Sequence, residues 1–335
     1  MSVDLSTTYL GLKLKNPLVV AACPLAGDIE VMERLEEAGA AAIVMPSLFE
    51  EQIEHDQLEM HAVRTFGSES FAEALDYFPE QDDYRTGPEQ YLQTMEAAKK
   101  KLHVPIMGSL NGTSDGGWVR YAKMMQEAGA DALELNIYHI AADLDASGAD
   151  VEKRHCDLIA KVKDSVNIPL AVKVGPYFSS IGHVARQMAE AGADGLVLFN
   201  RFLQPRIDID ALQVSSKLVL STPFELLLPV RWIAILRGRV QASLAHTSGV
   251  HSSEGAIQSL LAGADVVQVA SMLYKDGIHR LGAILDELAE WMEEKEYDSV
   301  EQLKGSMSQQ NCPDPEAFER GNYMKALTSF TGVPI

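Results

Sequence analysis

A lysine stands inside one of the most apolar strand-like segments of the chain. Lys173 lies in PLAVKVGPYF, which runs from Pro169 to Phe178. A lysine in such a segment needs a partner. It can neutralise negative charge that develops on a cofactor, form a Schiff base with a carbonyl substrate, or make a structural ion pair with a carboxylate. The residue type and its surroundings favour a functional amine at Lys173.

Three other polar side chains also end apolar runs. Asn136 closes LELN, Asn200 closes LVLFN, and His246 closes VQASLAH. Asparagines supply directional donors and acceptors to a flat polar ligand. The histidine has two interpretations, because a lone histidine at a strand end can face a ligand or be a hydrogen-bonded core residue.

Two later segments have the features of a phosphate-binding loop. HTSGVHSSEGA places Ser248 and Gly249 before a helix start, and VASMLYKDG places Ala270 and Ser271 before a second, short helix. Small residues leave backbone N–H groups accessible at a helix N-terminus, which favours an anion. The alternative is an ordinary loop with an N-capping serine. We expect a phosphate cradle, because both segments have the same features.

A repeated phrase predicts the elements that hold these residues. It reads EEAGAAAIVM at 36–45, QEAGADALEL at 126–135, AEAGADGLVL at 189–198 and LLAGADVVQV at 260–269. Each copy passes from a helix-like segment through a glycine, suited to a helix C-cap, into an apolar run. Near-continuous apolar strands are typical of parallel sheets buried on both faces.

The predicted strands alternate with helices along the chain. They lie at 17–22, 41–46, 104–109, 131–136, 168–174, 194–199, 240–246 and 265–270. Eight such units favour an α/β fold, the (β/α)8 (TIM) barrel, with the active site at the carboxyl ends of the strands. An open doubly wound sheet is the alternative, but no G-x-G-x-x-G follows the first strand.

Three segments lie outside the strand–helix alternation. Residues 7–14 are expected to form an N-terminal β-hairpin under the barrel, and the acidic, aromatic insert at about 47–90 follows strand 2 as a lid or a dimer surface. We expect a barrel domain over 1–295 and a C-terminal helical extension over 296–335.

Composition narrows the partners and the compartment. The chain has 335 residues, 47% of them apolar, and a formal net charge of −20. Such an acidic protein repels nucleic acid and anionic membranes. Cys23, Cys156 and Cys312 are far apart, so neither a metal site nor a disulfide framework is expected. No signal sequence and no long apolar run is evident, so we expect a cytoplasmic protein with a small-molecule substrate.

With these strand ends in view, the chain resembles the dihydroorotate dehydrogenase family of FMN barrels, and most of all its class 1, cytoplasmic branch. The segments that carry the resemblance are LGLKLKNPLVVAACPLAGD, LELN, LAVKVGPYF, FNR and TSGVHSSEGAIQSLLAGADVVQVASMLYKDG. The resemblance implies FMN as cofactor, a homodimer and a place in pyrimidine biosynthesis. The flavin contacts that it implies, together with Ser47 at the end of strand 2, are Ala21, Ala22, Asn136, Lys173, Asn200, Ser248, Gly249, Ala270 and Ser271.

The chain departs from the family pattern on the substrate side. Beyond Glu-Leu-Asn the family has a Ser-Cys-Pro-Asn run with a cysteine base, whereas this chain runs Ile137-Tyr138-His139-Ile140-Ala141. The resemblance places His139 where the base would be and Ala141 where the family has an asparagine that holds the substrate. Strand 2 ends Met-Pro-Ser in place of Thr-Lys-Ser. The family's Asn-Gly-x-x-Asn loop is replaced by YFPEQDDYRTGPEQY.

Three functional hypotheses follow. The first is an FMN-dependent oxidoreductase acting on a CH–CH bond, in which Lys173 stabilises charge on the reduced flavin and His139 or Tyr138 transfers the proton. Imidazole titrates near neutral pH, which favours His139, although a loop histidine can also serve only as a hydrogen-bonding group. The second is an FMN-binding pseudo-enzyme without dihydroorotate activity. The third is a flavin-free phospho-sugar lyase with a Schiff base at Lys173.

Overall fold

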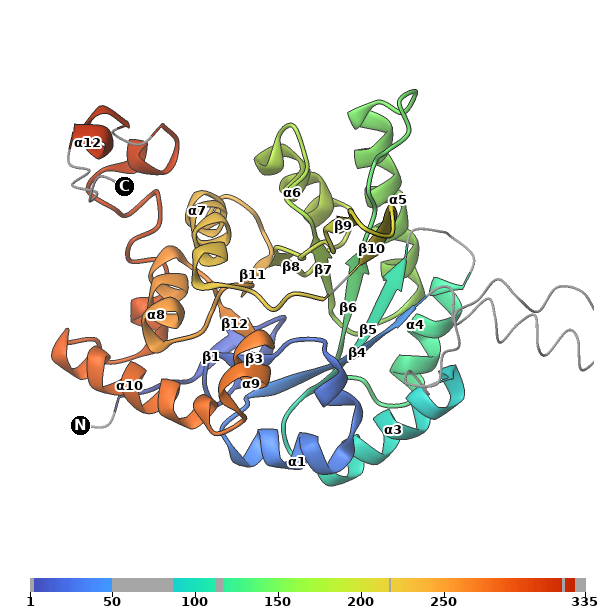
Figure 1. The fold of residues 1–335 in the computed structure, drawn as a ribbon. Helices are drawn as coiled ribbons and strands as arrows, with labels where there is room; N and C mark the ends of the chain where they lie inside the picture. The colour runs from blue at the N-terminus through green and yellow to red at the C-terminus, as the bar shows by residue number, and fades with distance from the viewer. Residues whose placement is uncertain (1–2, 50–86, 113–116, 217, 321–322, 329–335) are drawn as a thin grey trace, which may run out of the picture.

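Parallel strands close into a barrel, as the sequence predicts (Figure 1). The computed structural model describes residues 3–49, 87–112, 117–216, 218–320 and 323–328. Within these ranges the barrel contains eight strands, each hydrogen-bonded to its neighbours in chain order, with β12 closing on β3. Their bounds are β3 Leu18–Val20, β4 Ala42–Phe49, β5 Ile106–Gly112, β6 Ala132–Ile137, β7 Leu170–Val174, β8 Gly195–Leu198, β11 Ser243–Thr247 and β12 Val266–Val269.

Helices cover the outside of the barrel, as Figure 1 shows. Alternate strand residues face the barrel axis, where Ala132, Ala171 and Val197 form one apolar cluster with the N-terminal hairpin. The residues between them face outward and pack against the helices. The main helices are α1 Ile29–Glu37, α3 Pro88–Lys101, α4 Trp118–Glu127, α5 Gly148–Ser165, α6 Ile181–Glu190, α7 Leu227–Leu236, α8 Ser253–Ala262 and α10 Arg280–Glu294.

The repeated Ala-Gly-Ala phrase is a helix-to-strand junction, as expected. Its glycines all have positive φ, the conformation that ends a helix without strain: Gly39, Gly129, Gly192 and Gly263. The aspartate that follows in three copies binds the first residues of the preceding strand. Asp131 pairs with Lys99 at 2.6 Å and accepts the first β5 amide, that of Ile106, at 2.7 Å.

The other two aspartates repeat this arrangement. Asp194 pairs with Lys163 at 2.6 Å and accepts from Leu170 N at 2.8 Å, and Asp265 accepts from Leu244 N at 2.8 Å. The first copy has Ala41 at this position. In each of these three copies the aspartate therefore ties the start of its own strand to the start of the preceding strand.

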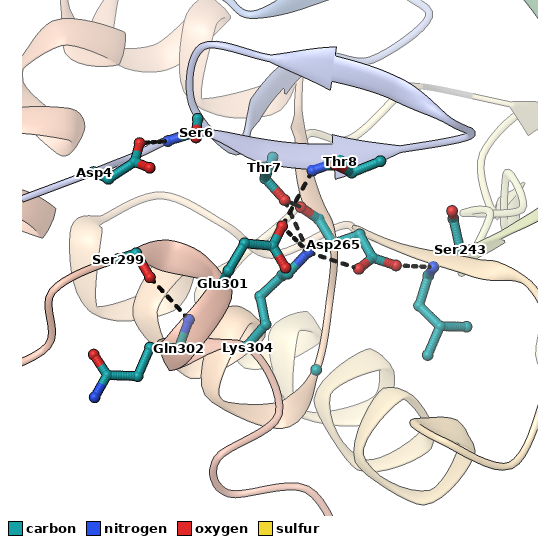
Figure 2. Close-up of polar contacts among 12 residues, drawn as sticks. Asp4, Ser6, Thr7, Thr8, Ser243, Asp265, Ser299, Glu301, Gln302 and Lys304 are labelled. Carbon is teal, nitrogen blue, oxygen red and sulfur yellow. Dashed lines mark hydrogen bonds and ion pairs between the residues drawn. The ribbon is translucent and has the colours of Figure 1, made fainter.

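The predicted N-terminal hairpin closes the bottom of the barrel. It consists of β1 Thr7–Tyr9 and β2 Leu12–Leu14, paired antiparallel, and Tyr9 and Leu14 pack among the inward-facing barrel residues. Lys304, which follows the short helix α11 Val300–Leu303, binds Thr7 Oγ1 and Asp265 Oδ1, both at 3.1 Å, and Glu301 Oε1 at 2.7 Å. Figure 2 shows this cluster, which joins the N-terminal hairpin to the segment that follows α11.

A second hairpin was not predicted. Strands β9 Pro205–Asp208 and β10 Gln213–Ser216 pair antiparallel beyond β8, near the β6 and β7 ends of the barrel (Figure 1). Each strand has only four residues, too few for apolar alternation to identify it, and all of β9 is exposed.

The remaining elements are short or lie partly outside the described residues. They are η1 Pro24–Gly27, η2 Pro223–Leu226, α9 Ser271–Asp276, η3 Pro315–Phe318 and α12 Tyr323–Thr328. Most of the predicted 47–90 insert lies outside the described residues, and Ser47 belongs to β4. Over the described part of the chain, no helix has the length and apolar character to span a bilayer.

Candidate active site

A cavity of about 170 Å³ lies at the carboxyl ends of the barrel strands. We call it the barrel-mouth cavity. It brings together most of the predicted cofactor-binding residues, namely Ala21, Ala22, Lys173, Asn200, Ser248, Gly249, Ala270 and Ser271. Asn136 adjoins this group, because Asn200 Nδ2 donates to Asn136 Oδ1 at 2.6 Å. Residues far apart in the sequence therefore converge on one site, as parallel strand ends in a barrel must.

The floor of the cavity holds a buried polar chain. The Lys173 ammonium lies 3.4 Å from Glu134 Oε1, and Gln268 Nε2 donates to Glu134 Oε2 at 2.7 Å. All three residues are buried, so the lysine's charge has a fixed partner below it. Gln268 Oε1, an acceptor, has no hydrogen-bond partner among the described residues.

The loop after β11 packs closely against the backbone at Glu225 and Leu226. Ser248 and Gly249 both have positive φ. A Cβ atom at Gly249 would come within 2.2 Å of Leu226 N, so this position tolerates only glycine. His246, buried at the end of β11, bonds through Nε2 to the Ser248 carbonyl at 2.9 Å. Of its two interpretations, His246 therefore fits the hydrogen-bonded core residue and not the ligand-facing one. Burial also lowers its pKa to about 4, so the ring is neutral.

Ser221, which was not among the residues predicted from the sequence, lies against the start of α9. Ser221 N donates to Ser271 Oγ at 3.0 Å, Lys275 Nζ donates to the Ser221 carbonyl at 2.7 Å, and Ser221 Oγ lies 3.0 Å from His251 Nε2. Ser221 also lines the barrel-mouth cavity. The sequence feature that could have drawn attention to Ser221 is the Thr-x-x-Glu capping box that begins at the next residue, Thr222.

The two predicted proton-transfer residues lie outside the barrel-mouth cavity. Tyr138 OH accepts a hydrogen bond from Leu203 N at 2.9 Å, and its ring packs 4.3 Å from the ring of Phe202. His139 Nε2 lies 3.3 Å from Arg154 Nη1 on α5, and burial followed by the Arg154 charge lowers the His139 pKa. His139 lines a different pocket, of about 390 Å³, which shares no lining residue with the cavity.

Ser47 is also absent from the lining of the barrel-mouth cavity. Its hydroxyl pairs with Ser109 Oγ at 2.8 Å across β4 and β5. The structure therefore gathers the lysine, the two asparagines and both predicted phosphate loops, and it does not bring Ser47, Tyr138 or His139 into the same cavity.

Comparison with known proteins decides the family. The sequence model of the dihydroorotate dehydrogenase family matches residues 84–292, well over half of the chain. The chain belongs to the dihydroorotate dehydrogenase family. It is 28% identical over 307 residues to the dihydroorotate dehydrogenase B (NAD(+)) catalytic subunit of Thermoplasma volcanium, covering 90% of this chain and 98% of the relative.

Other relatives have related names. The corresponding catalytic subunit of Thermoplasma acidophilum is 26% identical over 307 residues, 90% of this chain and 98% of that protein. A putative dihydroorotate dehydrogenase A (fumarate) of Aeropyrum pernix is 27% identical over 312 residues, 90% and 97% of the two chains. This dihydroorotate dehydrogenase-like chain is accordingly an FMN-dependent oxidoreductase of the CH–CH class, as the sequence predicted.

The described residues fit FMN. The loops at Ser248–Gly249 and Ala270–Ser271 leave backbone N–H groups beside the cavity, which suits a phosphate. Lys173 and the unpartnered Gln268 Oε1 give the floor one cationic donor and one acceptor, and a flavin ring has carbonyl oxygens and an N–H that match both. When bound, FMN supplies the hydride acceptor, while the protein supplies position and charge.

Proposed function

We propose that this protein oxidises dihydroorotate to orotate in pyrimidine biosynthesis. The observation that carries the proposal is the barrel-mouth cavity, in which Lys173 and the Asn136–Asn200 pair stand beside two phosphate-binding loops. The family match and the relatives named for this reaction support the same substrate. Oxidation removes a hydride and a proton from adjacent carbons, so the protein must provide a charge partner for the reduced cofactor and a base.

Lys173 is the proposed charge partner. Its ammonium is buried and held by Glu134, so little reorganisation is needed when negative charge develops above it. The Asn136–Asn200 pair fixes both amides, and Asn200 lines the cavity itself, where an amide can orient a flat, polar substrate.

His139 is the proposed base, with Tyr138 beside it as the second candidate. The support is its place in the sequence, three residues after Asn136, where the family has its base. In the structure His139 Nε2 is engaged by Arg154. Acid–base work at the barrel mouth therefore requires His139 to leave Arg154 when substrate binds, and apo geometry alone does not rule out such a residue.

Replacing His139 with alanine tests this role. We expect a fall of about 100-fold or more in the rate of flavin reduction, because a positioned base contributes roughly that much. FMN content should not change, since His139 does not line the barrel-mouth cavity. Stopped-flow absorbance under anaerobic conditions measures the rate.

A matched control uses another histidine–arginine pair. His183 on α6 is exposed, and its Nδ1 lies 3.2 Å from Arg186 Nη2. His183→Ala should keep the full rate. An unchanged rate in His139→Ala would exclude His139 as the base and leave Tyr138→Phe as the variant to measure.

We also propose that the protein forms a homodimer through the β9–β10 hairpin. The exposed fractions of Ile207, Leu212 and Val214 are 74%, 83% and 73%. Ile207 and Val214 are direct cross-strand partners. An isolated two-stranded hairpin is marginally stable in water, and an exposed apolar group of this kind marks an interaction surface. A second copy of the same hairpin supplies a matching apolar partner.

The double variant Ile207→Glu, Val214→Glu should therefore be monomeric. Burying a carboxylate at an apolar interface is costly, so the dimer should dissociate at micromolar concentration. Sedimentation equilibrium measures the mass. Leu144→Glu, which replaces an apolar residue that is 99% exposed in another loop, should remain dimeric. A monomeric wild-type protein, or a double variant that stays dimeric, contradicts this interface.

A further inference from the structure

A segment between β10 and α7 is fixed to the loops at the barrel mouth. We call this segment, residues 218–225, the strap. Arg201, which follows β8, donates from Nη1 to the Val219 carbonyl at 2.6 Å. Lys275, in the short helix after β12, donates from Nζ to the Ser221 carbonyl at 2.7 Å. Two cations from different strand ends therefore hold the backbone of the strap in place.

Ser221 is the strap residue that reaches the barrel-mouth cavity. It is only 3% exposed and lines the cavity together with Ser248, Gly249 and Ser271 of the two phosphate loops. Its backbone N–H donates to Ser271 Oγ at 3.0 Å. Because this contact uses a lone pair of the Ser271 oxygen, the Ser271 hydroxyl proton is left to donate to a ligand in the cavity.

His251 has the same relation to the Ser221 hydroxyl. Its Nε2 lies 3.0 Å from Ser221 Oγ. Burial, followed by the charge of Lys275, lowers the pKa of His251, so the neutral ring prevails at pH 7. With its proton on Nε2, the ring donates to Ser221 Oγ and leaves the serine O–H free to donate elsewhere. An anion in the cavity favours this tautomer, because only this one offers it a donor.

The charges around the Ser221 hydroxyl also suit an anion. Among the described residues that line the cavity, the charged ones are Lys173 and Arg201, and both are cations. Lys275 brings a third cation to the other side of the strap. The whole chain has a net charge of −20, so these local cations set this cavity apart from the acidic average of the molecule.

We propose that Ser221 is a further cofactor-binding residue, whose hydroxyl donates to the phosphate of FMN while His251 orients that hydroxyl. The phosphate then has donors from three segments: the two phosphate loops, including the Ser271 hydroxyl, and the strap. The proposal rests on the FMN of the family and not on dihydroorotate as substrate. It therefore stands or falls separately from the reaction proposed above.

Ser221→Ala tests the contact in the full-length holoprotein. Riboflavin lacks only the phosphate of FMN, so the variant should bind FMN about tenfold or more weakly and riboflavin as tightly as wild type, the loss expected for one hydrogen bond to a charged group. Dilution of protein loaded with either flavin, followed by the rise in free-flavin fluorescence, gives both dissociation constants. The ³¹P resonance of bound FMN should also shift. Ser165→Ala, which removes a hydroxyl bonded within α5, should match wild type.

Two variants of His251 separate orientation of the hydroxyl from packing. His251→Gln keeps an N–H donor near the place of Nε2 and should retain FMN affinity and the ³¹P signal. His251→Phe loses the donor and should weaken FMN binding by about three- to tenfold, with riboflavin binding unchanged. Equal FMN affinity in these two variants overturns the role of His251. Unchanged FMN affinity in Ser221→Ala, or an equal loss of FMN and riboflavin affinity, overturns the proposal.

Discussion

Replacing Lys173 with methionine is expected to slow the reduction of bound flavin by about 100- to 1,000-fold, the usual cost of losing one preorganised group that stabilises developing charge. The ammonium is buried at the floor of the barrel-mouth cavity and held by Glu134. Methionine has a similar length and no charge, so the cavity keeps its shape. The flavin reduction potential should also fall, because the reduced, anionic form loses its cation.

The measurement is anaerobic stopped-flow reduction, followed by a potentiometric titration. Lys153→Met provides a matched control, because Lys153 is an exposed lysine paired with Asp157 on α5. The double variant Lys173→Met, Glu134→Gln guards against an indirect effect, since it also removes the carboxylate that the single variant leaves buried without its cation. If Lys173→Met and the double variant both kept the wild-type reduction rate and flavin potential, Lys173 would have no part in the reaction.

Replacing Asp265 with alanine is expected to lower the free energy of unfolding by about 3–5 kcal/mol, the usual cost of breaking a buried ion pair from one side. Its Oδ1 pairs with Arg237 at 2.9 Å and with Lys304 at 3.1 Å, and its Oδ2 accepts from Leu244 N. The Lys304 side chain is only 3% exposed. Figure 2 shows that this cluster also holds the N-terminal hairpin through Thr7.

The repeat provides a matched control for this variant. Asp131 has the same place in its own helix-to-strand junction and the same strand amide bond, but its ion pair with Lys99 is more than a quarter exposed. Asp131→Ala should therefore cost only about 1–2 kcal/mol, from a partly solvated ion pair and one hydrogen bond. Chemical denaturation of the three proteins gives the comparison. An equal loss of unfolding free energy in Asp265→Ala and Asp131→Ala would mean that the buried Lys304 ion pair does not add to stability.

The barrel fold and most of the residues that line the barrel-mouth cavity could be predicted from the sequence, and the reason is physical. The Ala-Gly-Ala phrase combines a helix C-cap with the start of a buried strand, so it gives the alternation of elements directly. A closed parallel barrel then forces all strand ends to one rim. Lys173, Asn200 and the two phosphate loops needed no further information to be placed together.

The remaining features depended on contacts between distant segments. The orientation of His139 depends on its contact with Arg154 on α5. His139 lies beyond the end of β6, where the strand pattern no longer says which way a side chain points. Glu134 could have been found, because it lies two residues before Asn136 and so faces the same way. The β9–β10 hairpin is exposed, and its apolar side chains indicate a surface contact and not a core.

The central claim is that dihydroorotate passes its hydride to FMN held at the barrel mouth. Absorbance at 450 nm of the purified protein under anaerobic conditions, before and after addition of dihydroorotate, tests it most directly. We predict a yellow protein whose 450 nm band bleaches at a rate that falls in Lys173→Met. A yellow protein that dithionite bleaches and dihydroorotate does not would indicate an FMN-binding pseudo-enzyme or another substrate. A colourless protein trapped by borohydride with a ketone substrate would contradict the account and favour a Schiff base at Lys173.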